Sequence, residues 1–166
     1  MSLSVLLIFA CSKDDDANEQ EEQNQAQTIV LTLDNIDVNT ATNDVWTEES
    51  LDLSFVNTTD DDCVAGSSSF GIETTFVWLY PSRLKVDLQG LQNIERVEVV
   101  VNDFCSEGCT QAFLIGSSGT IISNAANTQI SAQETLVVEN PSGGAVNELA
   151  ISSCEGQVLE ITIYRS

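Results

Sequence analysis

The sequence contains no histidine and very little positive charge. Five Lys and Arg residues stand against 26 Asp and Glu residues, which gives a formal net charge of −21 at pH 7. Without histidine the chain has no Ser-His-Asp or Cys-His arrangement, and the most common general base is missing. A surface this acidic repels phosphate backbones and anionic headgroups and attracts divalent cations, so we do not expect nucleic acid to be a partner.

Other signatures of catalysis are also missing. Glycosidases that use two carboxylates need them directed at one bond. The pairs Glu95/Glu98 and Glu49/Asp52 have odd spacings, which place their carboxylates on opposite faces of a strand. The glycine pair at 143–144 lacks the lysine of a phosphate-binding loop. We therefore predict that the protein is not an enzyme.

The sequence also lacks the apolar periodicity of a helix. No window of about a dozen residues has an apolar stripe with a 3.6-residue period, although 42% of the residues are hydrophobic. Apolar and polar residues instead alternate in short segments, and the residues at 116–119 read as a hairpin turn. The predicted strands lie in 28–33, 51–55, 82–88, 94–101, 112–116, 120–123, 135–138, 146–152 and 157–164. Residues 28–166 are thus predicted to form an all-β domain, an antiparallel sandwich of nine or ten strands.

The N-terminal apolar segment, Leu3 to Ala10, is too short to span a bilayer and suits the hydrophobic region of a signal peptide. The stretch Ile8-Phe9-Ala10-Cys11 resembles a bacterial lipobox, in which cleavage leaves a diacylated N-terminal cysteine. The following Ser-Lys-Asp-Asp-Asp resembles the surface-export tag of Bacteroidota lipoproteins. This resemblance implies a signal peptide over 1–10, lipidation of Cys11 and anchoring in outer-membrane lipid, facing the cell exterior. Residues 11–27, rich in acids and amides, would form a flexible, disordered tether.

Four further cysteines form an even set, which in an oxidising compartment indicates two disulfides. Cys105 and Cys109 flank a short loop in which Gly108 can reverse the chain, so we expect these two to pair. Cys63 and Cys154 would then form the second bridge. A zinc site is the competing interpretation, but the spacing is not that of a zinc knuckle and no histidine can contribute.

The order of features from about Trp46 to Ile163 resembles the jelly-roll sandwiches of carbohydrate-binding modules and galactose-binding-like domains. These features are LYPSRLKVDL, a valine-rich strand ending in NDFC, the hairpin and the closing GQVLEITI. The resemblance implies a structural calcium ion near the first and last strands, held by oxygen ligands. Glu160 would be one ligand, and Asp34, Asp37 or Glu48 could join it. The alternative is that these acids are only solvated surface charges.

The aromatic residues Phe76, Trp78 and Tyr80 alternate in TFVWLYP, so a regular strand would place all three rings on one face. They could form a platform that stacks on sugar rings, with Arg83 and polar residues such as Asn102 and Asp103 binding hydroxyl groups. Because Val77 and Leu79 make the opposite face apolar too, the rings could instead fill the sandwich core. Trp46 has the same two interpretations.

The sequence therefore predicts a non-catalytic lipoprotein on the cell surface that binds an extracellular carbohydrate through Phe76, Trp78, Tyr80 and Arg83. The alternative is a structural or adhesion subunit that binds a partner protein and has no sugar site. Exposure of the three aromatic rings distinguishes the two.

Overall fold

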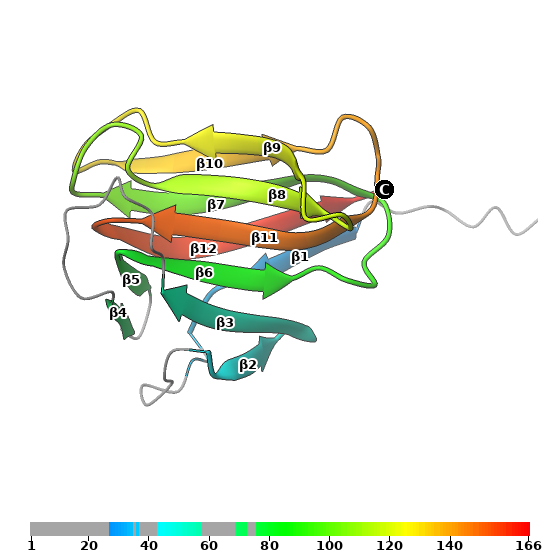
Figure 1. Ribbon diagram of the computed structural model, residues 1–166, viewed down its shortest axis with the longest axis horizontal. Helices are drawn as coiled ribbons and strands as arrows, with labels where there is room; N and C mark the ends of the chain where they lie inside the picture. Colours follow the sequence, from blue (N-terminus) through cyan, green and yellow to red (C-terminus); the bar gives the residue numbers. More distant parts are fainter. Residues whose placement is uncertain (1–26, 35, 37–42, 58–68, 73–75) are drawn as a thin grey trace, which may run out of the picture.

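The computed structural model describes residues 27–34, 36, 43–57, 69–72 and 76–166. Within them every regular element is a β-strand, and no helix suited to crossing a membrane occurs (Figure 1). In chain order the strands are β1 (Gln27–Leu31), β2 (Val45–Glu48), β3 (Leu51–Asn57), β4 (Ser69–Ile72), β5 (Val77–Tyr80), β6 (Ser82–Asp87), β7 (Ile94–Asp103), β8 (Gln111–Gly116), β9 (Ile121–Ala126), β10 (Gln133–Glu139), β11 (Val146–Ser153) and β12 (Gly156–Arg165).

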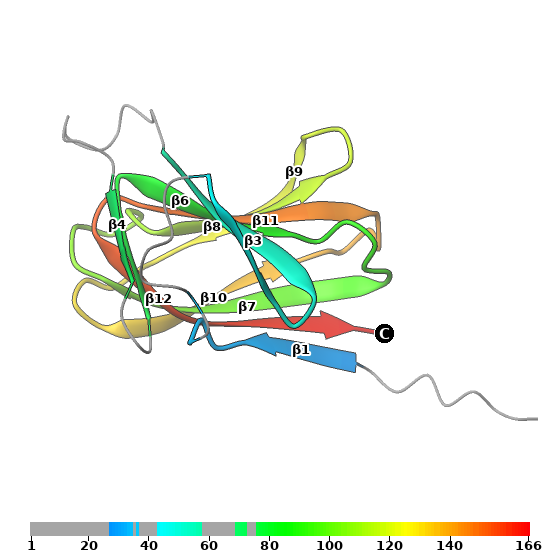
Figure 2. The same cartoon turned by 90° about the horizontal axis from the view of Figure 1, so that it is seen from below.

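These strands form two six-stranded antiparallel sheets, which Figure 2 shows edge-on as two layers. Sheet A has the order β10-β7-β12-β5-β4, and β1 also pairs with β12. Sheet B has the order β2-β3-β6-β11-β8-β9. The prediction of an all-β antiparallel sandwich is confirmed.

Strand β12 organises sheet A. One edge of β12 pairs with β7 along its whole length. The other edge pairs with β5 over Gly156–Val158 and with β1 over Ile161–Arg165. The last strand therefore joins the first strand to β5, the strand that carries the aromatic residues.

The core lies between the sheets and consists of the inward-facing residues of the alternating strands. Val97, Val99 and Val101 of β7 are fully buried, as the period-two pattern predicts, and so are Leu84 and Val86 of β6. The predicted hairpin is also present, with Gly119 in the left-handed region at φ 75° and its N–H donating to Gly116 O. The nine predicted strand segments are present, and β2, β4 and the aromatic strand β5 bring the described strands to 12.

Candidate functional site

Strand β5 places its aromatic residues on the outer face of sheet A. Val77 and Leu79 are both 0% exposed and point into the core, facing the inner side of sheet B. Their alternating neighbours must therefore point outward. Trp78 is half-buried, Tyr80 is 36% exposed, and Phe76, just before the strand, is also half-buried. The interpretation that these three rings fill the core is therefore wrong.

The rings form a continuous group, to which Phe104 adds a fourth member. The Trp78 ring stacks on Tyr80 at a centroid distance of 5.6 Å and an angle of 16°. Phe76 meets Trp78 edge-on at 5.9 Å, and Phe104 lies 5.1 Å from Trp78 at 38°. We call Phe76, Trp78, Tyr80 and Phe104 the ring surface. Aromatic faces of this kind can pack against the apolar C–H groups of a ligand.

Two amide side chains continue this surface across the sheet. Gln157 of β12 lies in register with Trp78 on one side and with Asn102 of β7 on the other. Asn102 Nδ2 donates to Gln157 Oε1 at 3.2 Å, whereas Asn102 Oδ1 is buried with no hydrogen-bond partner among the described residues. The Asn102–Gln157 hydrogen bond joins the two amides beside the rings.

On the other side of Trp78 the sheet carries no side chain. Gly71 of β4 lies in register with Trp78. A Cβ atom at Gly71 would lie 3.4 Å from Trp78 Cβ and 3.6 Å from Cδ1. A larger residue at this position would cover the flank of the indole, so glycine keeps that side of the ring accessible.

The sequence did not identify Phe104 as a member of the ring surface, or Gln157 as its neighbour. Phe104 follows the end of β7, and its position depends on the neighbouring loop. Gln157 becomes a neighbour of Trp78 only through the pairing of β12 with β5. Regular alternation from Leu159, Ile161 and Ile163 would have placed Gln157 on the inward face. The bulge between Val158 and Glu160 reverses this, so the sequence carried no signal for Gln157.

Arg83 and Asp103, by contrast, do not lie on the ring surface. Arg83 belongs to β6 of sheet B, where its Nε donates to Ser152 Oγ of the adjacent β11 at 2.8 Å. Asp103 is fully buried and serves the loop that follows it. Trp46 packs against the core, stacked on Phe55 with centroids 4.9 Å apart.

The outer face of sheet B carries a separate polar groove of about 440 Å³. Its central feature is the ion pair between Lys85 and Glu148, whose charged atoms lie 2.5 Å apart. Among the residues that the structure describes, no aromatic ring lines this groove. The groove is lined by Val45, Asp52, Leu53, Ser54, Lys85, Asp87, Gln89, Ile115, Gly116, Ser117, Gly119, Asn147 and Glu148.

The predicted calcium ligands that the structure describes do not form a cluster of three carboxylates. Glu48 Oε1 accepts from Thr32 N at 2.6 Å and Leu33 N at 3.1 Å, while its Oε2 is buried without a hydrogen-bond partner among the described residues. Glu160 is half-buried at a bulge of β12, where Thr162 Oγ1 donates to it. The carboxylates of Asp34, Glu48 and Glu160 are not within 4.8 Å of one another, and Asp37 lies outside the described residues. Calcium takes about six to eight oxygen ligands, to which backbone carbonyls and waters also contribute, so the calcium site stays a prediction.

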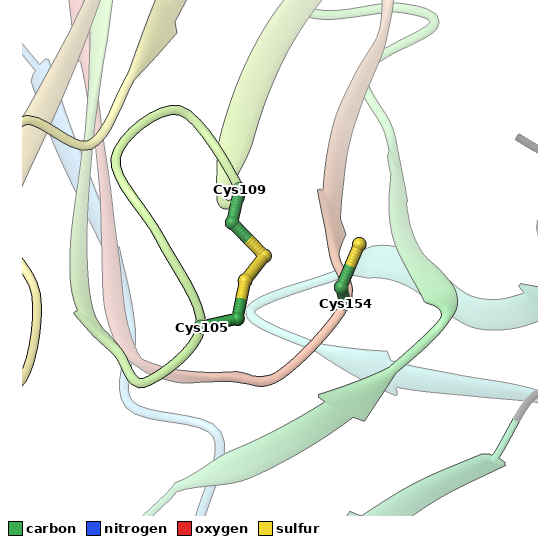
Figure 3. Close-up of side chains that lie close together, drawn as sticks. All are labelled: Cys105, Cys109 and Cys154. Atoms are coloured by element: carbon green, nitrogen blue, oxygen red, sulfur yellow. A yellow bond between two sulfur atoms is a disulfide. The ribbon is translucent and has the colours of Figure 1, made fainter. Parts of the chain in front are cut away.

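The cysteines lie at the end of the sandwich next to Phe104. Cys105 and Cys109 form a disulfide, as their spacing predicts, with Cα atoms 6.3 Å apart. Figure 3 shows Cys154 beside this bridge, on the turn between β11 and β12. The three sulfur atoms lie within 4.8 Å of one another, and Cys154 is also disulfide-bonded. Cys63 and Cys11 lie outside the described residues, so the Cys63–Cys154 pairing and the lipidation stay predictions.

Comparisons with known proteins identify the fold. No family model matches the chain, and no curated protein is similar to it in sequence. Among solved structures it is similar to a mutant of a family 29 carbohydrate-binding module complexed with mannohexaose, with a TM-score of 0.55 at 5% identity, covering 84% of this chain and 92% of that one. A second mutant of the same module gives a TM-score of 0.52 at 6% identity, covering 84% and 93%. The protein therefore has a jelly-roll sandwich like that of carbohydrate-binding modules.

Proposed function

We propose that this protein is a non-catalytic module that binds an extracellular carbohydrate at the ring surface on the outer face of sheet A. The observation that carries the proposal is the outward placement of Phe76, Trp78 and Tyr80, fixed by the burial of Val77 and Leu79. The amides of Asn102 and Gln157 then provide polar contacts for hydroxyl groups next to the rings. The similar modules support the proposal, since one of them is complexed with mannohexaose.

The polar surroundings of the rings favour a sugar over a protein partner. Cores of protein–protein interfaces are depleted in charged residues. Here the charged Glu160 and the amide of Gln157 lie on β12, the strand that pairs with β5, and the amide of Asn102 lies on β7, the next strand along. A sugar has both C–H groups, which can pack on the rings, and O–H groups, which can hydrogen-bond to the neighbouring amides.

The first experiment is a glycan array that includes mannohexaose and cellulohexaose, followed by calorimetry on the best ligand. Trp78→Ala should weaken binding by at least about tenfold, since buried aromatic anchors carry most of the energy of a binding site. Tyr80→Ala, at the exposed end of the ring surface, should weaken it less and provides a second test. Ile121→Ala, which removes an apolar side chain 59% exposed on β9, is the matched control.

The same experiment distinguishes the two faces of the sandwich. Asn147→Ala changes the groove of sheet B and leaves the ring surface intact. If Asn147→Ala abolishes binding and Trp78→Ala does not, the sugar binds in the groove and our assignment is wrong. If no glycan binds and crosslinking recovers a protein, the adhesion alternative holds.

We further propose that Cys11 carries the lipid anchor and that the domain faces the exterior of the cell. The lipobox-like segment and the acidic stretch after it support this location. Mass spectrometry of the mature protein should find an acylated N-terminal cysteine, and protease added to intact cells should remove the domain. An intact Met1 in cytosolic protein would contradict the proposal.

A further inference from the structure

We propose that the Cys105–Cys109 bridge is a redox-sensitive clamp that holds Phe104 against Trp78. A dithiol reductant that opens the bridge would then weaken glycan binding at the ring surface. The link to glycan affinity rests on the proposed function, whereas the clamp itself concerns only this chain.

The base of the loop between β7 and β8 is fixed by a buried network. Asp103 is fully buried, and its Oδ1 accepts from Cys105 N at 3.0 Å while its Oδ2 accepts from Thr110 Oγ1 at 2.5 Å. Thr110 Oγ1 also contacts Ser153 Oγ at 2.8 Å. Asn127 Oδ1 accepts from Thr110 N, and Asn127 N donates to Thr110 O. These hydrogen bonds pair the buried polar groups with one another, and a paired buried network is rigid. The network therefore holds both ends of the loop in place even when the bridge is open.

The outer part of the loop is held by separate hydrogen bonds rather than by one fully buried network. Ser106 O accepts from Asn127 Nδ2 and Cys109 N, and Gly108 O accepts from Gln111 Nε2. Phe104 N donates to Glu155 O at 2.9 Å, and Gly108 N donates to Asn127 O at 2.9 Å. The bridge joins Cys105, the residue after Phe104, to Cys109 on the opposite arm of the loop. It thereby limits the directions in which the Phe104 ring can turn away from Trp78, at a centroid distance of 5.1 Å.

The bridge is accessible to a reductant, because Cys105 and Cys109 are both only half-buried. One thiolate of the dithiol attacks a bridge sulfur, and the other cysteine leaves as a thiolate. The second thiol of the reductant then attacks the mixed disulfide, which leaves two protein thiols and an oxidised reductant. Two electrons and two protons pass to the bridge in all.

We expect the sandwich to fold without this bridge. The bridge closes a loop with a sequence separation of only 4, and short loops gain the least from a crosslink. The buried core lies between the sheets, away from the exposed loop. The double variant Cys105→Ser/Cys109→Ser should therefore fold, and it spares the disulfide of Cys154, which a reductant would also attack.

The test reads Trp78 directly by fluorescence. The chain has two tryptophans, and Trp46→Phe leaves Trp78 as the only one. That background is mild, because Trp46 Nε1 is buried without a hydrogen-bond partner among the described residues. In this background the double Ser variant should shift Trp78 emission to longer wavelength, as water reaches the indole. The double Ser variant should bind the best array glycan about three- to tenfold more weakly. This is the change in affinity that corresponds to the loss of one aromatic pair.

Phe104→Ala provides the second arm. It should produce the same shift with the bridge intact, and combining it with the double Ser variant should add nothing further, because both changes remove one contact. Unchanged emission and affinity in the folded double Ser variant, or fully additive effects, would overturn the clamp. A non-additive emission shift in a protein that binds no glycan would retain the clamp and reject the proposed function.

Discussion

At the scale of single residues, the buried carboxylate of Glu48 stabilises a segment of backbone that lies beyond the end of a strand. Glu48 is 6% exposed and accepts hydrogen bonds from the backbone of Thr32 and Leu33, just after β1 ends. Leu33 there has a positive φ of 58°, so no strand partner can continue the ladder. The carboxylate replaces those missing backbone partners.

Glu48→Ala should therefore lower the free energy of unfolding by about 2–3 kcal/mol, because two backbone N–H groups lose their acceptor. Urea denaturation measures this change. Glu49→Ala, at the exposed neighbouring position, is the control and should stay within about 0.5 kcal/mol of the parent. An equal effect of the two variants would contradict the assigned role of Glu48.

Glu134 offers a pH-dependent contact. The backbone N–H of Thr128 donates to its carboxylate, and this is the main cause that lowers the pKa of Glu134 below its ordinary value, with further donation from the Thr128 hydroxyl and Gln129 N. A lowered folded-state pKa means that the contact stabilises the protein above the unfolded-state pKa and is lost as pH falls through the folded-state value.

Carboxyl NMR titration should place the Glu134 pKa below that of a model peptide. The amide signals of Thr128 and Gln129 should move with the same midpoint, since they share the contact. Thr128→Val removes the hydroxyl donor and should raise the Glu134 pKa part of the way back. A midpoint at the model-peptide value would show that the Thr128 contacts are not formed in solution.

At the scale of elements, the turn from β11 to β12 matters most, because it supports both the loop of Phe104 and the strand beside Trp78. Gly156 opens β12 in a space too small for a side chain. A Cβ atom there would lie 2.6 Å from both Ser153 Oγ and Thr110 Oγ1. Glycine at this position is thus a requirement of the buried network around Asp103.

Gly156→Ala should lower the free energy of unfolding by about 1–3 kcal/mol, the usual cost of overpacking. Gly116→Ala is the matched control, because the nearest atoms to its Cβ would lie at an ordinary 3.5 Å. Thermal unfolding should show a clear loss for the first variant and a small change for the second. The same Gly156 variant should also perturb Trp78 fluorescence, since Gln157 and Phe104 would move.

At the scale of the whole molecule, the net charge of −21 is the property that most affects stability in salt. Like charges on one compact body repel one another, which destabilises the folded state and is screened by salt. Ion pairs such as Lys85–Glu148 and Arg96–Glu98 do not offset this repulsion, because pairs near the surface contribute little to stability. The melting temperature should therefore rise between low salt and about 0.5 M NaCl, and no rise would show that the repulsion is negligible.

The same field should select among ligands. Oligosaccharides that carry uronate or sulfate groups should bind more weakly than neutral ones of the same backbone, with a smaller difference at high salt. Matched neutral and acidic pairs on the array, read at two salt concentrations, measure this. If neutral and acidic oligosaccharides bind equally well at low salt, the bound sugar lies outside the negative electrostatic potential of the protein.

The amino-acid pattern alone determined the all-β class, most of the strands and the Cys105–Cys109 bridge. Strand alternation and loop spacing are local properties, and strands such as β6 and β7 have one clearly apolar face. In β5 both faces are apolar, so periodicity could not decide which set of side chains faces the core. Only the pairing of β5 with β12 and β4 resolved that ambiguity, by directing Val77 and Leu79 inward.

Which residues lie in and beside the ring surface also depended on the tertiary structure. Phe104, Gln157 and Trp78 are far apart in the sequence and meet through strand register and a disulfide loop. Arg83 is only three residues from Tyr80, yet the chain passes from sheet A to sheet B between them. Local sequence determines which residues can form a strand, whereas the neighbours of a side chain depend on long-range pairing, and long-range pairing placed these rings on an exposed face.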